Sequence, residues 1–213
     1  VADVSGNGQD GAIVGGATWQ DGALRLDGAT GYVDLPDNLL AGLEDITVEA
    51  DVWIDSAQTG AYFIYGLGNT AAGAGNGYLF TTGNAYRTSL ATGNWTTEQT
   101  VSQGSNLARG RWAHLTYTLE GTNATIYLDG VAVATSTVTA NPGDIGGGTT
   151  TANYLGRSNY DSDNRFRGQF REFAIFNRAL SSAEVLETSG NTQALADVSL
   201  AEDVLKTAPI VDA

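Results

Sequence analysis

The sequence has no cysteine and no methionine, and Lys206 is its single lysine. A chain without cysteine forms no disulfide, so the small folds that depend on disulfide bridges are excluded. Catalysis by a nucleophilic cysteine is excluded for the same reason. No apolar run approaches the roughly 20 residues that a membrane-spanning helix needs. These absences leave the folds that are held together by a hydrophobic core.

Positive charge is also scarce, since 10 Lys and Arg residues stand against 24 Asp and Glu residues and the net charge is −14. Such a chain repels the phosphates of nucleic acids and of anionic lipids, so we expect neither nucleic acid nor a membrane as partner. Cations and neutral sugars remain compatible with this charge. The charge also serves to keep an exported protein soluble, which is an explanation that requires no ligand.

Glycine is abundant, with 28 glycines among 213 residues. Glycine reaches positive φ without steric cost, so this composition favours short strands joined by tight turns. Residues 46–55 show the clearest alternation, with apolar side chains on one face and mostly polar ones on the other. The dipeptides Asp21-Gly22 and Asp129-Gly130 each separate two alternating segments and predict hairpins with type I′ turns.

The pattern as a whole predicts an all-β fold, a two-sheet antiparallel jelly-roll sandwich with a short C-terminal helical tail. Ser181 followed by Glu184 three residues later predicts the start of that tail. We therefore expect a jelly-roll domain at residues 1–185 and a helical extension and linker at residues 186–213. Further strands are expected at residues 17–20, 23–26, 32–35, 62–67, 77–82, 86–90, 112–119, 125–128, 131–135, 154–156 and 166–176.

Three segments carry a pattern that resembles a known family. They are Asp3-x-Ser5-Gly6-Asn7-Gly8 with residues 23–36, then Trp112-x-His114-Leu115 with residues 126–130, and finally residues 168–181. Taken in this order over residues 3–185, they resemble the bacterial laminin-G-like family of concanavalin A-like jelly rolls. Members sit beside the catalytic domains of secreted glycoside hydrolases or in adhesins and other surface proteins. Some of them bind sugar and others pack against a neighbouring domain.

The resemblance also implies one structural calcium ion, which relatives often hold where the opening loop meets the last strand. Calcium takes 6–8 oxygen ligands from carboxylates, amides and backbone carbonyls. The predicted side-chain ligands are Asp3, Asn7, Asp27 and Glu172. The last of them stands where relatives commonly carry Asp. Asp and Asn also stabilise turns by bonding their own backbone, which explains the opening loop without a metal.

Sugar recognition needs an aromatic ring against the C–H face of the sugar and planar polar groups for its hydroxyls. Residues 156–161 look most like a binding loop, because they bring a cation, an amide, an aromatic ring and a carboxylate close together. The predicted carbohydrate-binding residues are Tyr65, Tyr78, Arg87, Trp95, Arg157, Asn159, Tyr160 and Asp161. The alternative for any one of them is a structural role, as a ring half buried on a sheet or one partner of a surface Arg–Asp pair.

An enzymatic alternative rests on Glu49 and Asp51, which the two-residue period of a strand places on one face. Jelly-roll glycosidases use paired carboxylates in this way. The simpler explanation is the exposed polar face of a strand. The single histidine, His114, occurs in relatives without a catalytic role, and the chain has no Gly-x-Ser-x-Gly motif. We therefore predict a module without catalytic activity.

The sequence thus predicts a carbohydrate-binding accessory module of a larger secreted protein, a bacterial polysaccharide-degrading enzyme being the expected parent. The export signal is expected upstream of the segment. The alternative is a structural or adhesive domain that packs on a neighbouring domain or on a protein partner. An aromatic groove lined by Asn, Asp and Arg favours the first, and a contiguous apolar patch favours the second.

Overall fold

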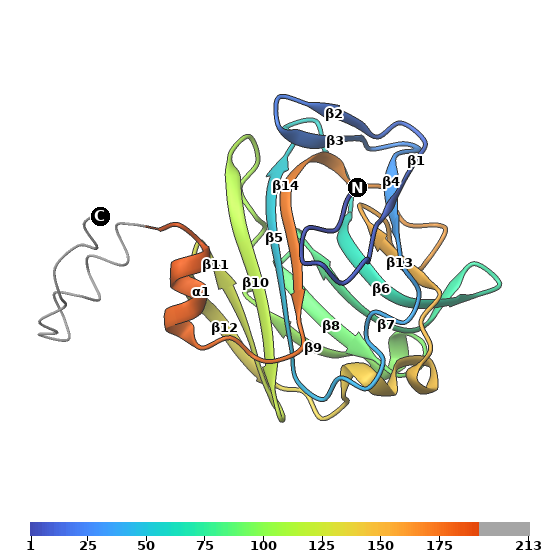
Figure 1. Cartoon of the computed structure of the whole chain (residues 1–213), viewed down its shortest axis with the longest axis vertical. Coiled ribbons are helices and arrows are strands. Elements are labelled where there is room, and N and C mark those ends of the chain that lie inside the picture. The colour runs from blue at the N-terminus through green and yellow to red at the C-terminus, as the bar shows by residue number, and fades with distance from the viewer. Residues whose placement is uncertain (192–213) are drawn as a thin grey trace, which may run out of the picture.

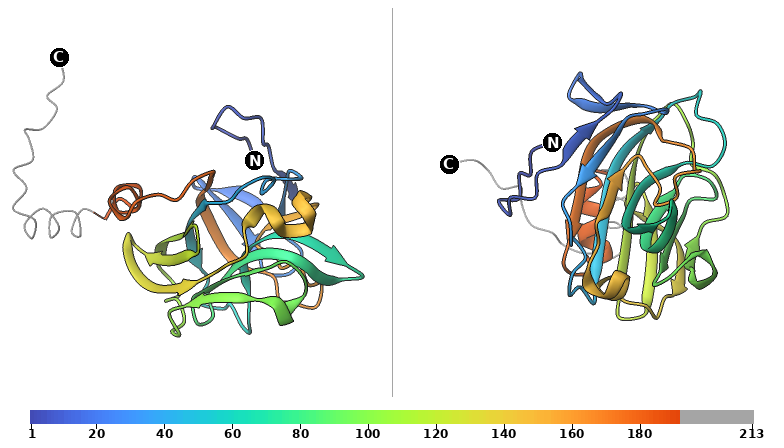
Figure 2. Two further views of the ribbon diagram at one scale, coloured as in Figure 1. Left: turned by 90° about the horizontal axis from the view of Figure 1, so that it is seen from below. Right: turned by 90° about the vertical axis from the view of Figure 1, so that its right-hand side faces the viewer.

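The computed structural model describes residues 1–191, which form two antiparallel sheets packed face to face (Figures 1 and 2). Two short 3-10 helices, η1 (Trp95–Thr97) and η2 (Pro142–Gly148), and one α-helix, α1 (Ser182–Thr188), complete the described part of the chain. The sequence prediction of an all-β, two-sheet jelly-roll sandwich is confirmed.

Each sheet has seven strands. In sheet A the order is β1 (Ala12–Val14), β4 (Tyr32–Leu35), β13 (Ala152–Leu155), β6 (Phe63–Ala71), β7 (Ala74–Thr82), β8 (Arg87–Ala91) and β9 (Gln99–Ser102). In sheet B the order is β12 (Val131–Thr137), β11 (Asn123–Leu128), β10 (Trp112–Glu120), β5 (Ile46–Ile54), β14 (Arg167–Phe176), β3 (Ala23–Asp27) and β2 (Thr18–Gln20).

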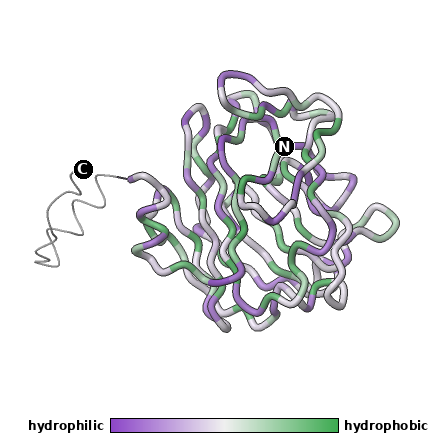
Figure 3. Tube along the Cα trace, viewed as in Figure 1, coloured by the Kyte–Doolittle hydropathy of each residue, from purple (hydrophilic) through white to green (hydrophobic). Residues whose placement is uncertain are grey.

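The core lies between the two sheets and is built from alternate residues of each strand. On β5, Val48 and Val52 are at most 1% exposed and face the other sheet. β5 pairs with β10 on one side and β14 on the other, so it is a central strand. Figure 3 shows the alternation as short green and purple steps along the strands. The period of two in the sequence therefore identifies the core face, as the pleat of a strand requires.

Both predicted hairpin turns are present. Asp21 and Gly22 have φ of 50° and 76°, and Asp129 and Gly130 have φ of 51° and 81°. Positive φ at both central residues is the requirement of a type I′ turn, and it explains why Asp-Gly stands at both places. These turns fix the pairing of β2 with β3 and of β11 with β12.

Two strands and one long hairpin were not expected from the sequence. β1 and β9 are edge strands, and each pairs with a single neighbour, β4 and β8 respectively. Short edge strands bury little surface, so their side chains show no clear alternation. β6 and β7 run on beyond their predicted ends to a turn at Ala72 and Gly73, both with positive φ.

Helix α1 lies on the outer face of sheet B, at the left of Figure 1. Ser181 caps it, since its hydroxyl accepts the N–H of Glu184 while that carboxylate accepts the N–H of Ser181 at 2.8 Å. Val185 and Leu186 are buried. The boundary expected between residues 185 and 186 thus falls inside a packed helix. The rest of the expected extension, residues 192–213, lies outside the described residues.

Candidate functional site

The outer face of sheet A carries a second apolar cluster, separate from the core. On β7, Leu79 points into the core, whereas Tyr78 and Phe80 point outward. With Phe63 and Ala91 these two rings form a small buried group, and Tyr160 from the loop after β13 packs on it. The rings of Tyr78 and Tyr160 meet edge to face, with centroids 5.6 Å apart.

Polar groups connect this cluster into one network. The Tyr78 hydroxyl donates to Glu98 Oε1 at 2.8 Å, and Arg87 Nη1 donates to Glu98 Oε2 at 3.0 Å. The hydroxyls of Tyr78 and Tyr160 lie 3.2 Å apart. Burial, together with the bonds to Tyr160 and Glu98, raises the pKa of Tyr78. The Tyr78 hydroxyl therefore stays neutral and keeps its role as a donor.

Trp95 stands at the edge of this network as an exposed ring. Its side chain is 68% exposed, and it opens the 3-10 helix η1 between β8 and β9. Asn94 caps that helix by accepting the N–H of Thr96 at 3.0 Å. The backbone N–H of Trp95 donates to Tyr160 Oη at 3.1 Å. These contacts fix the backbone at Trp95, and the ring stands out in solvent.

The loop at residues 156–161 lies directly on sheet A. A Cβ at Gly66 of β6 would stand 2.7 Å from Asn159 Oδ1, so only glycine leaves room for the loop there. Asn159 is 3% exposed, and its amide donates to the carbonyl of Ala152 at 2.7 Å. The loop therefore divides the outer face of sheet A into a side above β7–β9 and a side above β4 and β13.

On the β4 and β13 side, two arginines pack on two tyrosines. The rings of Tyr32 and Tyr154 meet edge to face at 5.4 Å, and the Arg157 guanidinium lies 4.5 Å from the Tyr154 ring centre. Arg165 lies 5.0 Å from the ring centre of Tyr32. Arg157 Nη2 donates to Asp161 Oδ1 at 2.6 Å. This cluster fixes the base of the loop. The guanidinium of Arg157 packs on Tyr154 and pairs with Asp161, so its contacts are made within the protein.

The structure thus sorts the eight predicted carbohydrate-binding residues into groups. Tyr78, Arg87, Trp95 and Tyr160 come together above β7–β9. Arg157 and Asp161 pair with each other on the other side of the loop, and Asn159 is buried beneath it.

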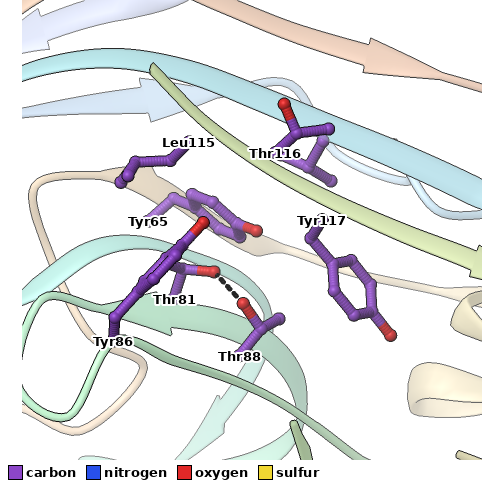
Figure 4. Close-up of a pocket in the computed structure, with 8 residues that line it drawn as sticks. Tyr65, Thr81, Tyr86, Thr88, Leu115, Thr116 and Tyr117 are labelled. Carbon is purple, nitrogen blue, oxygen red and sulfur yellow. Dashed lines mark hydrogen bonds between the residues drawn. The ribbon is translucent and has the colours of Figure 1, made fainter. Parts of the chain in front are cut away.

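Tyr65 does not belong to this surface. It is 2% exposed and lies between the sheets, beside Tyr86 and Tyr117, with its hydroxyl near the bonded pair Thr81 and Thr88 (Figure 4). The gap around these side chains leaves no space for a water molecule. A bulge in the pairing of β6 with β7 turns Tyr65 inward. The prediction of Tyr65 as a sugar-binding residue is therefore wrong.

Two members of the network above β7–β9 are absent from the predicted set. Glu98 joins Tyr78 to Arg87, and Phe80 carries the Arg87 guanidinium 4.7 Å from its ring centre. Phe80 follows Tyr78 at the spacing that puts both on one face of a strand, which is a signal in the sequence. Glu98 follows a one-turn helix, and no local pattern connects it to β7.

The four predicted calcium ligands lie in three parts of the fold. Asp3 and Asn7 share the opening loop, where the Asp3 carboxylate accepts two backbone N–H groups at 2.8 and 2.9 Å. Asp27 ends β3, where its Oδ1 accepts three backbone N–H groups at 2.8–2.9 Å. Glu172 is exposed on β14. Within residues 1–191 no three His, Cys, Asp or Glu side chains gather as a metal site, so the structure does not bring Asp3, Asp27 and Glu172 together.

Glu49 and Asp51 of β5 lie beside His114 of β10 on the outer face of sheet B. His114 Nδ1 is 2.8 Å from Asp51 Oδ1, and Nε2 is 3.5 Å from Glu49 Oε1. The hydroxyl of Thr188 in α1 donates to the same Glu49 oxygen at 2.7 Å. Burial opposes the charge of His114, but its hydrogen bond to Asp51 and the negative charges of Asp51 and Glu49 outweigh burial and raise its pKa to about 9. Glu49 is 2% exposed, so this is not the open polar face that the alternation predicts.

Two seven-stranded antiparallel sheets with this strand order define a jelly-roll protein of the concanavalin A-like type. The family model for Laminin_G_3, described as the concanavalin A-like lectin/glucanases superfamily, matches residues 27–186. The chain belongs to this family. No curated protein sequence matches the chain. No helix among residues 1–191 is long and apolar enough to cross a membrane.

Solved structures share the fold. One is domain 4 of AbnA, a GH43 extracellular arabinanase from Geobacillus stearothermophilus, in complex with arabinotriose, with 20% identity, a TM-score of 0.70 and 87% of this chain and 91% of that chain covered. The CBM40 of Ruminococcus gnavus IT-sialidase, bound to α2,3 sialyllactose, shows 16% identity, a TM-score of 0.66 and coverage of 82% and 100%. A botulinum neurotoxin type C structure shows 18% identity and a TM-score of 0.63, with 89% of this chain and 48% of that chain covered.

Proposed function

We propose that the chain is a non-catalytic carbohydrate-binding module and that it binds sugar on the outer face of sheet A above β7–β9. The observation that carries the proposal is the exposed Trp95 ring, which stands on a backbone whose N–H donates to the Tyr160 hydroxyl. A flat aromatic ring in solvent offers a sugar its apolar face, and it has only two side-chain torsions to order on binding.

The polar groups around Trp95 suit a sugar that lies on the ring. Arg87 and Glu98 are partly exposed, with side-chain exposures of 32% and 18%. Each holds the other at 3.0 Å, so their remaining donors and acceptors have fixed directions.

The solved structures supply independent support. The arabinanase domain is seen with arabinotriose and the CBM40 with sialyllactose. The arabinanase domain also matches this chain over nearly its full length. We propose by analogy that this module belongs to a larger extracellular protein, such as a polysaccharide-degrading enzyme.

A glycan array with neutral plant and microbial polysaccharides tests the proposal, using the module and two variants. Trp95→Ala removes the platform, and a central tryptophan in a binding surface contributes about 2 kcal/mol or more, so we expect binding to fall about 30-fold. Trp19→Ala is the matched control, because Trp19 is also exposed, at 56%, but lies on β2 in the other sheet. The control should bind like the wild type.

Two outcomes would contradict the proposal. Equal binding of the same glycan by the wild type and by Trp95→Ala would show that the surface above β7–β9 does not bind it. An array without any signal would favour the alternative of a structural or adhesive domain that docks on a neighbour.

A structural calcium ion at the opening loop is a separate proposal, now limited to this loop. Its support is the set of side-chain oxygens that Asp3, Asn7 and Asp10 supply on one short loop. A ligand that binds only the folded state raises its stability with concentration. We expect the Tm to rise with millimolar calcium, to fall with chelator, and to respond to neither in Asp3→Ala. A Tm of the wild type that calcium leaves unchanged rules the site out.

A further inference from the structure

The outer face of sheet B has a hollow that the proposed function does not use. It lies beside the Asp27 turn, where β2 and β3 approach β14 at the top of Figure 1, and its volume is about 360 Å³. This is within the range of about 300–1,000 Å³ that small-ligand sites occupy. Its lining consists of Gly16, Thr18, Gln20, Arg25, Leu26, Asp27 and Arg167.

Two arginines from neighbouring strands stand on this hollow. Asp27 of β3 pairs with Arg167 of β14, and Arg25, two residues away on β3, pairs with Gln169. Arg25 and Arg167 are therefore diagonal neighbours, with Cα atoms about 7–8 Å apart by ordinary sheet geometry. Two guanidinium groups on one small hollow are unusual in a chain with 10 Lys and Arg residues and a net charge of −14.

These arginines make few direct contacts with acidic groups. Arg25 Nη1 lies 3.4 Å from Gln20 Oε1, and within residues 1–191 no carboxylate comes within 4.0 Å of its guanidinium. Arg167 makes one ion pair, through Nε to Asp55 Oδ2 at 3.5 Å. Its side chain is 45% exposed, and its two terminal nitrogens have no partner among the described residues.

Asp27 is the one carboxylate in the lining, and its oxygens are already in use. Oδ1 accepts three backbone N–H groups, and Oδ2 accepts the hydroxyl of Thr30 at 2.9 Å. A side chain at Gly16 would collide with Oδ2, so the turn closes tightly over the carboxylate. Burial opposes ionisation, but the hydrogen bonds prevail and lower the pKa of Asp27 to about 2. Asp27 therefore holds the turn and forms no ion pair with Arg25 or Arg167 among the described residues, while its negative charge remains at the edge of the hollow.

The hollow thus offers two guanidinium groups, a hydroxyl and an amide, while the side chain of Leu26 is buried in the core. A guanidinium binds a carboxylate through paired hydrogen bonds in one plane. Thr18 and Gln20 provide hydrogen bonds for hydroxyl groups. We propose that this hollow is a second ligand site, and that it binds a carboxylate-bearing sugar residue, such as a uronic acid, through Arg25 and Arg167.

Isothermal titration calorimetry at low ionic strength with trigalacturonate tests the site, with galactotriose as the neutral match and inorganic sulfate as a bare anion. We expect the wild type to bind trigalacturonate, and Arg25→Gln and Arg167→Gln each to bind it at least tenfold more weakly. Arg109→Gln is the matched control, since Arg109 is an exposed arginine outside the hollow. Trp95→Ala should bind trigalacturonate unchanged, which separates this site from the surface on sheet A.

Three results overturn the proposal. In the first, the wild type does not bind trigalacturonate. In the second, Arg25→Gln and Arg167→Gln bind trigalacturonate as tightly as the wild type does, and in the third, Trp95→Ala binds galactotriose as tightly as trigalacturonate. Sulfate that binds as tightly as the trimer also counts against it, because the hollow would then recognise any anion and no sugar. Both substitutions replace exposed side chains, so we expect them to fold.

Discussion

Replacement of His114 by glutamine is expected to lower the free energy of unfolding by about 3–5 kcal/mol, which is the usual cost of removing one partner from a buried ion pair. His114 is 6% exposed and lies between the carboxylates of Asp51 and Glu49. Glu49 is 2% exposed, so in the variant its charge would remain buried with two hydroxyl donors, those of Thr116 and Thr188. Chemical denaturation with urea measures the loss.

Two further variants make this prediction specific. Glu49→Gln in the His114→Gln background removes the unpaired charge, so it should recover part of the lost stability. Arg111→Gln is the control, because Arg111 pairs with Asp129 nearby at 3.0 Å but both side chains are well exposed, at 46% and 37%. Surface pairs of this kind contribute about 0–1 kcal/mol. A loss below about 1 kcal/mol in His114→Gln, or no recovery in the double variant, would falsify the buried-pair explanation.

The stability of the wild type is expected to fall by about 3 kcal/mol between pH 6 and pH 10 because of the same histidine. The pKa of His114 rises from its ordinary 6.5 to about 9 in the folded state. A raised pKa means that the folded protein holds the proton more tightly than the unfolded chain. The stabilisation is therefore complete below pH 6.5 and is lost as the pH rises through about 9. Arg171 Nη2 lies 3.8 Å from Asp51 Oδ2, so a second cation lies beside this pair.

Urea denaturation at a series of pH values measures this dependence, and His114→Gln isolates it. The stability of the variant should depend much less on pH across the same range, since the variant lacks the imidazole of His114. A wild-type profile as flat as that of the variant would show that His114 is not protonated in the folded protein. Helix α1 packs over Glu49, so the protection of α1 amides relative to their intrinsic exchange rate at each pH should fall as the wild type is taken above pH 9.

The sugar-binding prediction shows where local sequence stops being informative. Tyr65 and Tyr78 look alike in the sequence, since each is a tyrosine in a glycine-rich alternating segment. The bulge in β6 directs Tyr65 into the core, whereas Tyr78 points outward to Glu98. Which face a strand residue occupies depends on register, and one added residue reverses it. Pattern alone therefore placed the aromatic residues in strands but not on a common face.

The same limit applies to the polar face of β5. The alternation correctly identifies Val48 and Val52 as core residues. It also predicts an exposed face at Glu49, which instead lies beneath α1, a helix that begins more than 130 residues later in the chain. The capping box at Ser181 reveals that a helix starts there, but nothing local indicates which surface it covers.

The sequence by itself determined most of the strands, the two Asp-Gly hairpins and the start of α1, because these features depend on residues close together in the chain. Its motifs also indicated the family. Tertiary structure alone decided which side chains meet. Sheet order places β13 between β4 and β6, and β14 between β3 and β5. Those pairings bring Tyr160 to Trp95, Arg167 to Arg25, and α1 to Glu49. Each of these contacts joins segments that are far apart along the chain, so no local sequence pattern could predict it.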